Sequence, residues 1–306
     1  MSQNYDYEFE VTEQRRKLWN VEMEIYSYFK EVCNKHNLKY FAVGGTLLGA
    51  ARHKGFIPWD DDMDFGMPYE DYIKFMYIMK EECKEPYHLL SIVTDPVYGG
   101  ITLSRLRRSD TTACSKWEYD HVGSFSDNED YNMGIWIDIL PFCNVPVDEE
   151  TRKAQKEQIM DVWKAVRGYS ALEAAEKGRE SVVNPEYKEY IDIYKKYSEK
   201  YSLDEIKMLY LERCGMNKER TGLLGVTSFR TFQPNLIWKT EWFDETVELP
   251  FENITVTCPK YYNEVLTHQY GDWRIPVKNA AYHEIYIYDA DVPYKEYFKK
   301  LRQENK

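Results

Sequence analysis

The sequence lacks any apolar run that approaches the roughly 18 residues of a membrane-spanning helix. Residues 1–10 also lack the basic and apolar segments that together form a secretory leader. These two absences predict a cytoplasmic protein with no membrane span.

Cysteine is sparse, and no two cysteines form a C-x-x-C pair. This spacing argues against a zinc site, and a disulfide scaffold is not expected in a chain of this length. We therefore predict small buried thiols in a reducing compartment. The six residues are Cys33, Cys83, Cys114, Cys143, Cys214 and Cys258.

Positive charge is also in deficit, since 40 Lys and Arg stand against 52 Asp and Glu and give a net charge of −12. Nucleic-acid binding depends on basic surfaces, so the composition argues against a nucleic-acid partner. An anionic substrate is still possible, because a few arginines or a bound cation can reverse the local field.

The chain has 306 residues and is 43% hydrophobic, which is enough for a substantial core. Apolar periodicity and glycine or proline breaks predict alternating helices and strands in the first half. The expected elements are a helix over 13–35, a strand over 38–43, a short helix over 46–51, a strand entered through the loop at 60–65, and strands over 101–108 and 134–140, the last closed by Pro141.

The second half begins with a long, charged segment of helical period. A capping box at Ser202 and Glu205 predicts one helix start within it. A β-hairpin over 245–257 and a helix from about 259 to 270 follow. We predict an α/β (α+β) fold with a small mixed sheet in a core over 1–147, an appended helical region over 148–225, and a C-terminal hairpin and helix over 226–306 that pack back on the core.

Three aspartates stand out by position. Asp62 and Asp64 are two residues apart in an apparent strand, so their side chains should share one face. Asp138 lies between Ile137 and Ile139 and should point away from the core. Three carboxylates brought together repel one another unless a cation neutralises them, and Mg²⁺ or Mn²⁺ prefers such oxygen ligands. Phosphoryl transfer is the chemistry that most depends on this arrangement.

The glycine pair Gly44-Gly45 supplies a second part of the predicted site. Glycine lets the backbone approach a phosphate closely, and the following Thr46 and helix start offer free N–H groups. Basic residues nearby could steer or bind an anionic donor, although each could equally be a solvated or structural charge. These candidates are Arg52, His53 and Lys54 after the short helix, and Arg105 and Arg107 on one face of a strand.

The block GGTLLGAARHKGFIPWDDDMD, from Gly44 to Asp64, resembles the signature of the LicD family. These are phosphocholine transferases related to the fukutin group, within the nucleotidyltransferase-fold superfamily. The resemblance continues through the Gly134–Pro141 strand and returns near Pro250, Pro259 and the Tyr270–Trp273 segment, whereas residues 150–235 match no family pattern.

The resemblance implies a nucleotidyltransferase-like core in which Asp62, Asp64 and Asp138 hold the metal, with Asp138 also able to accept a proton. Asp60 and Asp61 would support these ligands. The implied reaction transfers phosphocholine from CDP-choline to a hydroxyl of a surface glycan or its lipid-linked precursor, such as teichoic acid or lipopolysaccharide, and releases CMP. The enzyme would then meet the inner face of the membrane only transiently.

Two alternatives stay open. The chain could transfer ribitol phosphate or glycerol phosphate from another CDP-alcohol, or it could be a catalytically inactive nucleotide- or glycan-binding member of the fold. A choline head group would require aromatic faces for its quaternary ammonium. The candidates near the motif strands are Trp117, Tyr119, Tyr131 and Trp136, for which ordinary packing is the competing interpretation.

Overall fold

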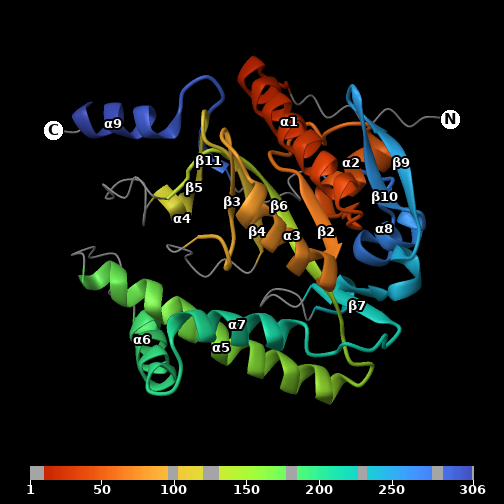
Figure 1. Cartoon of the computed structure of the whole chain (residues 1–306). Helices are drawn as coiled ribbons and strands as arrows, with labels where there is room; N and C mark the ends of the chain where they lie inside the picture. The colour runs from red at the N-terminus through yellow and green to blue at the C-terminus, as the bar shows by residue number, and fades with distance from the viewer. Residues whose placement is uncertain are drawn as a thin grey trace.

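The protein is represented by a computed structural model that describes residues 10–95, 103–119, 131–176, 185–226, 233–277 and 285–304. Its centre is a mixed sheet with strand order β1-β2-β6-β4-β3, extended by β7 and β8 beside β6. These strands are β1 (Phe41–Ala42), β2 (Asp64–Pro68), β3 (Tyr87–Leu90), β4 (Ser104–Arg108), β6 (Ile135–Asn144), β7 (Leu223–Val226) and β8 (Ile237–Lys239). The predicted mixed α/β class is confirmed (Figure 1).

Strand β6 is the axis of this sheet. It pairs in parallel with β2 on one edge and antiparallel with β4 and then β7 on the other. The pairing places Asp138 opposite Asp64 on one side and opposite Arg105 on the other. Residues from three distant parts of the chain therefore meet across adjacent strands.

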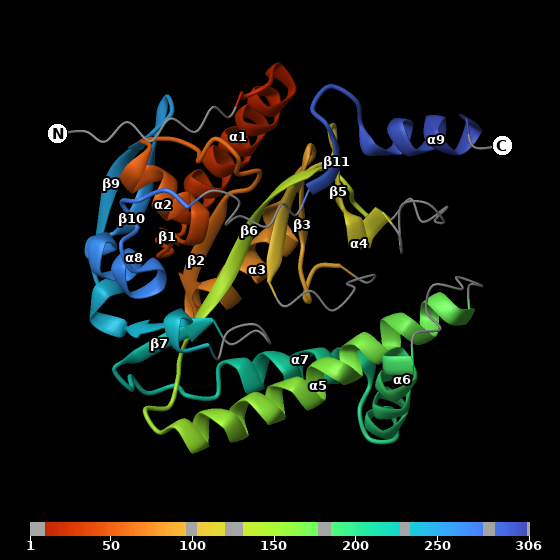
Figure 2. The same ribbon diagram turned by 180° about the vertical axis from the view of Figure 1, so that it is seen from behind.

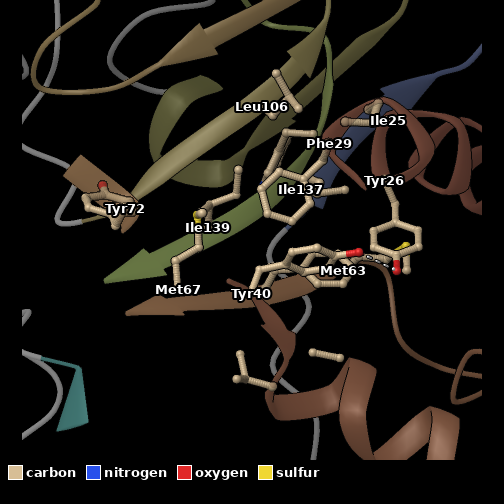
Figure 3. Close-up of a cluster of buried hydrophobic side chains, with 14 of the residues drawn as sticks. Ile25, Tyr26, Phe29, Tyr40, Met63, Met67, Tyr72, Leu106, Ile137 and Ile139 are labelled. Atoms are coloured by element: carbon tan, nitrogen blue, oxygen red, sulfur yellow. Dashed lines mark hydrogen bonds between the residues drawn. The ribbon is translucent and has the colours of Figure 1, made fainter. Parts of the chain in front are cut away.

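One face of the sheet is apolar and is covered by helices α1 (Glu13–Lys35) and α3 (Tyr69–Glu82). Figure 3 shows Ile137 and Ile139 of β6 facing Phe29 of α1, with Tyr72 of α3 at the side. All four side chains are buried. Because side chains alternate along a strand, this packing turns Asp138 to the opposite face, as its position between two isoleucines predicted.

The expectation that Pro141 closes the central strand is wrong, because β6 continues to Asn144. On one edge of β6 the partner changes from β4, whose pairing reaches Ile139, to β7, whose pairing starts at Phe142. Pro141 falls between these two pairings. A residue without an amide hydrogen is tolerated where that edge has no ladder bond to make.

The predicted helical segment contains α5 (Glu149–Glu176), α6 (Pro185–Ser198) and α7 (Leu203–Cys214). Figures 1 and 2 show the three helices grouped together beyond β7. The capping box is confirmed, since Ser202 Oγ accepts from the N–H of Glu205 and the Glu205 carboxylate accepts from the N–H of Ser202. None of the helices in the described ranges has the length and apolarity needed to cross a membrane.

The C-terminal part contains the predicted hairpin, β9 (Thr246–Phe251) and β10 (Ile254–Pro259), followed by α8 (Tyr262–Tyr270). Glu252 in the hairpin turn ties it to the loop after α2 (Gly44–Arg52), because Glu252 Oε1 accepts from the N–H of Phe56 at 3.1 Å. A second small sheet pairs β5 (Thr112–Ser115) with β11 (Ile285–Asp289), beside the short α4 (Lys116–Glu118) and ahead of α9 (Tyr294–Glu304). The division of the chain after residues 147 and 225 stays a prediction.

Candidate active site

The three aspartates singled out in the sequence meet at one point of the sheet. One carboxylate oxygen from each of Asp62, Asp64 and Asp138 lies within 4.8 Å of the other two. Asp64 opens β2, but Asp62 lies in the preceding loop rather than in the expected strand, because β2 starts only at Asp64. The loop conformation, and not strand alternation, brings Asp62 to the group. Three hard oxygen donors this close fit a Mg²⁺ or Mn²⁺ ion.

Gly44 and Gly45 form the first turn of α2 next to these carboxylates. Gly44 has a φ of +54°, a left-handed conformation that glycine adopts without strain. A Cβ on Gly44 would lie 3.0 Å from Asp64 Oδ2, and one on Gly45 would lie 2.3 Å from Asp60 Oδ2. The two glycines thus let carboxylates lie against the helix N-terminus, where free N–H groups and the helix dipole favour negative charge.

Thr46 follows in the same turn and is buried. Its Oγ1 accepts a hydrogen bond from the backbone N–H of Asp64 at 2.7 Å. The backbone oxygen of Asp64 accepts in turn from the N–H of Val43 at 3.1 Å. The Thr46 hydroxyl, expected beside a phosphate, therefore fastens the start of β2 to α2 in this structure.

Further acidic side chains lie next to Asp62 and Asp64. Oxygens of Asp60, Asp61 and Asp62 also lie within 4.8 Å of one another. Glu22 of α1 is fully buried, and neither of its carboxylate oxygens has a hydrogen-bond partner among the described residues. Arg15 provides positive charge, with its Nη1 3.7 Å from Asp61 Oδ2. We call Asp60, Asp61, Asp62 and Asp64 the carboxylate cluster.

Burial and crowding oppose negative charge in the carboxylate cluster. Burial, reinforced by the charge of Asp61, raises the pKa of Asp60 to about 7. Burial and then the charges of Asp64 and Asp60 raise the pKa of Asp62 well above its ordinary value. Burial, followed by the charge of Asp61, does the same to the pKa of Glu22. A bound cation or a proton would relieve this repulsion.

Arg105 brings positive charge to the third aspartate. Its Nε donates to Asp138 Oδ1 at 3.0 Å, and its Nη1 donates to Glu118 Oε1 at 3.3 Å. The three side chains are at most 5% exposed. The residue expected to bind phosphate therefore links a candidate metal ligand to a buried glutamate in this structure.

Glu118 is the centre of a second cluster, which we call the arginine network: Arg105, Arg107, Glu118 and Tyr131. Arg107 Nη2 and the Tyr131 hydroxyl both donate to Glu118 Oε1, the latter at 2.9 Å. Glu118 Oε2 accepts from the N–H of Ser115 at 2.8 Å. Burial alone would raise the pKa of Glu118, but Arg107, Arg105 and these hydrogen bonds lower it to about 2.

Trp136 underlies both arginines of this network. Its ring centroid lies 4.4 Å from Arg105 Cζ and 4.7 Å from Arg107 Cζ, which is cation–π geometry. Trp136, Arg107 and Tyr131 are no more than 2% exposed. In this conformation the two aromatic rings, which were candidates for choline contact, face the arginines, and Arg107 has no surface that could reach a phosphate.

The two other aromatic candidates belong to α4 and its end. Tyr119 is half-buried, with its ring centroid 5.3 Å from that of Tyr286 and 5.7 Å from Lys116 Nζ. The side chain of Trp117 lies outside the described part of the chain. Tyr119 does not line the cavity that opens beside the carboxylates.

That cavity has a volume of about 290 Å³. Asp62 and Asp64 line it together with Gly45 and Arg52, so it adjoins the candidate metal ligands and the helix N-terminus. Its aromatic lining residues are Trp59, Tyr270 and Trp273. Carboxylates, one arginine and aromatic faces are thus available to a single ligand.

Of the three predicted basic residues Arg52, His53 and Lys54, only Arg52 lines this cavity. Its Nη1 donates to the backbone oxygen of Trp273 at 2.8 Å. His53 is half-buried, and burial together with Arg52 lowers its pKa to about 4, so it is neutral near pH 7. Lys54 is exposed at a turn with φ +59° and does not line the cavity.

Sequence reasoning missed Glu118 as the hub of the arginine network, and Trp59, Tyr270 and Trp273 as cavity walls. The Ser115-x-x-Glu118 spacing is a capping-box signal, but it does not reveal that the carboxylate also binds two arginines. The aromatic residues lie within the segments that carry the family resemblance, which was the available signal. Burial and partners of side chains from separate elements are set only by the fold.

A glycine turn at a helix start, two aspartates entering the next strand and a third aspartate on the adjacent parallel strand are the arrangement expected of a nucleotidyltransferase-type domain. Residues 37–158 match the family model described as LicD/FKTN/FKRP, nucleotidyltransferase domain. The resemblance to the LicD family that the sequence motifs indicated is thus supported over this domain.

Relatives agree with this assignment over short, well-matched segments. The chain is 43% identical to the lipopolysaccharide cholinephosphotransferase LicD of Haemophilus influenzae over 67 residues, which are 22% of this chain and 25% of the relative. It is 48% identical to the human ribitol 5-phosphate transferase FKRP over 44 residues, 14% of this chain and 9% of the relative. The matched segments thus span a quarter or less of these relatives.

Proposed function

We propose that this protein transfers a phospho-alcohol group from a CDP-alcohol to a hydroxyl of a glycan, with release of CMP and with help from a divalent metal ion. The observation that carries the proposal is the meeting of Asp62, Asp64 and Asp138 beside the cavity of about 290 Å³. The names of two relatives, a cholinephosphotransferase and a ribitol 5-phosphate transferase, support phospho-alcohol transfer.

Asp62, Asp64 and Asp138 would hold the Mg²⁺ or Mn²⁺ ion, which when bound neutralises charge on the phosphate oxygens. Arg52 lines the same cavity and offers a positive charge to the donor's diphosphate. The first turn of α2 offers N–H groups and its positive dipole end. An acceptor hydroxyl must lose a proton, and a carboxylate of the same group can accept it.

The preferred donor is CDP-choline, and its head group would lie against the aromatic wall of the cavity. Trp59, Tyr270 and Trp273 offer faces to which a quaternary ammonium is attracted. The indole Nε1 of Trp273 is a buried donor with no acceptor among the described residues, so it can bind a donor oxygen. This assignment replaces the earlier aromatic candidates Tyr131 and Trp136, whose rings contact arginines.

Ribitol or glycerol phosphate remains the rival head group, because the relatives differ in the alcohol they are named for. A glycan or lipid-linked glycan acceptor and action at the cytoplasmic face of a membrane belong to the same proposal. The inactive binding protein is the less favoured alternative, since all three aspartates are present and adjacent.

The direct test incubates the protein with CDP-choline, CDP-ribitol and CDP-glycerol, each with Mg²⁺ or Mn²⁺, and measures CMP release with and without a sugar acceptor. We expect metal-dependent release that is greatest with CDP-choline and is lost in the Asp62→Ala/Asp64→Ala double variant. Turnover of CDP-ribitol alone would favour the rival donor. Undiminished release by the double variant would refute the mechanism.

A further inference from the structure

We propose that Glu118 is a positioning residue for the active site: its carboxylate holds Arg105 in the orientation in which Arg105 binds Asp138. The inference rests on the proposed function, because it concerns one of the three carboxylates assigned to the metal. Glu118 comes from α4, outside the motifs that identify the domain, and it makes no contact with the metal group itself.

The contacts of Arg105 show how the orientation is fixed. Nε donates to Asp138 Oδ1 at 3.0 Å, while Nη1 donates to Glu118 Oε1 at 3.3 Å. A guanidinium is planar and rigid, so fixing two of its nitrogens fixes the plane. The ring of Trp136, 4.4 Å from Arg105 Cζ, supports one face of that plane.

Glu118 is itself held from several sides, which makes it a suitable anchor. It closes a capping box with Ser115, in which both the side chain and the backbone of each residue participate. The Tyr131 hydroxyl donates to the same oxygen that binds Arg105, at 2.9 Å. With its side chain 1% exposed, Glu118 has little freedom to move away from these partners.

The consequence concerns Asp138. Its Oδ1 is engaged by Arg105, so the orientation of its carboxylate toward Asp62 and Asp64 depends on where Arg105 is held. Partners that orient a metal ligand from behind typically affect metal affinity or activity by about 10–100-fold when they are removed. Glu118 would act on Asp138 indirectly, by holding Arg105.

A variant that replaces Glu118 alone would be difficult to interpret, because it leaves the buried charge of Arg107 unpaired. The informative variant is therefore Arg107→Met/Glu118→Met, in which two apolar side chains replace a buried ion pair. The Arg107→Met single variant is its matched reference, since the two proteins differ only at residue 118. Arg108→Met is a control on the same strand, where the arginine binds the exposed Asp110.

Mn²⁺ binding is measured by calorimetry on each full-length variant, with circular dichroism to confirm folding. We expect the dissociation constant for Mn²⁺ to be at least about 10-fold weaker in the double variant than in Arg107→Met. We also expect kcat for CMP release to fall while KM for the CDP-alcohol stays within about twofold, because Asp138 lies at the reacting group rather than along the aromatic wall.

Equal Mn²⁺ affinity in the double variant and in Arg107→Met would overturn the positioning role, and would leave the proposed function intact. A different result would indicate failure of the proposed function: wild-type protein that binds Mn²⁺ no better than Asp62→Ala/Asp64→Ala. The positioning role would then fall with it, since no metal group would exist for Glu118 to organise.

Discussion

The carboxylate cluster and the arginine network both adjoin Asp138 and both contain buried charged groups, but they differ in charge balance. In the cluster, burial and like charges raise the pKa of Asp60 to about 7. In the network, the opposite charges of Arg107 and Arg105 overcome burial and lower the pKa of Glu118 to about 2. Burial therefore does not set the sign of a shift, and the neighbouring charges decide it.

This difference in charge balance suits the two groups to different roles. A balanced, hydrogen-bonded network stabilises the fold and holds side chains in place, whereas an unbalanced cluster is costly until a cation enters it. Sites that bind metal and phosphate are expected to be of the second kind, and to be supported by the first. The following changes test whether the two clusters respond in opposite ways.

The largest effect is expected from Asp64→Asn, which removes one charge from the metal group without changing the size of the side chain. CMP release should fall by about 10³-fold, equivalent to roughly 4 kcal/mol of transition-state stabilisation, because the metal's ligand set is incomplete. Steady-state assays with saturating Mn²⁺ measure it. Asp291→Asn, an exposed aspartate paired with Lys17, is the control and should retain activity. A loss of less than tenfold would contradict the assignment of Asp64.

Glu118→Gln should act mainly on stability and should lower the free energy of unfolding by about 3 kcal/mol at pH 7, because it leaves the buried Arg107 without the carboxylate it pairs with and removes one of the two carboxylates that Arg105 binds. The folded pKa of Glu118 is about 2 and lies below its ordinary value of 4.5, so ionised Glu118 stabilises the fold above about pH 4.5. That stabilisation is lost as the pH falls toward 2.

Urea denaturation of both proteins between pH 3 and pH 7 measures this effect. The difference between wild type and Glu118→Gln should shrink as the pH falls below 4.5. The exposed Glu149, which pairs with Lys153, provides a control variant, Glu149→Gln, with almost no effect. A pH-independent difference would show that the network does not depend on the ionised carboxylate.

Asp60→Asn should have the smallest effect and the opposite sign. The folded pKa of Asp60, about 7, lies above its ordinary value of 3.8, so its ionisation destabilises the metal-free fold. Stability linked to this group is present below about pH 4 and is lost as the pH rises through 7. In the presence of a chelator, the variant should therefore gain on the order of 1 kcal/mol at pH 8 and nothing at pH 4.

Thermal denaturation at these two pH values, with and without added Mn²⁺, measures the gain. Mn²⁺ should stabilise the wild type at pH 8 and so reduce the advantage of the variant. If Asp60→Asn destabilised the metal-free protein at pH 8, the contrast between the cluster and the network would be lost.

Much of the architecture could be predicted from local pattern. The helix over 13–35 agrees with α1 in both bounds, because apolar spacing and the Thr12 cap are properties of adjacent residues. The hairpin was also expected, and so was a helix that ends at Tyr270, because glycine commonly follows the last residue of a helix; Gly271 takes a φ of +71° there. The continuation of β6 beyond Pro141 was not expected from the sequence, because it depends on which strand pairs with β6 at that point.

Residue types at fixed short spacings were enough to predict the resemblance to the LicD family, the grouping of the three aspartates and the mixed α/β class. The contacts of Arg105, Arg107, Tyr131 and Trp136, and the presence of Glu118 among them, became evident only from the folded structure. Those contacts arise from strand register and from the packing of α4, which bring together residues up to 33 positions apart. Burial then fixes whether each charge is balanced, and local sequence carries no record of it.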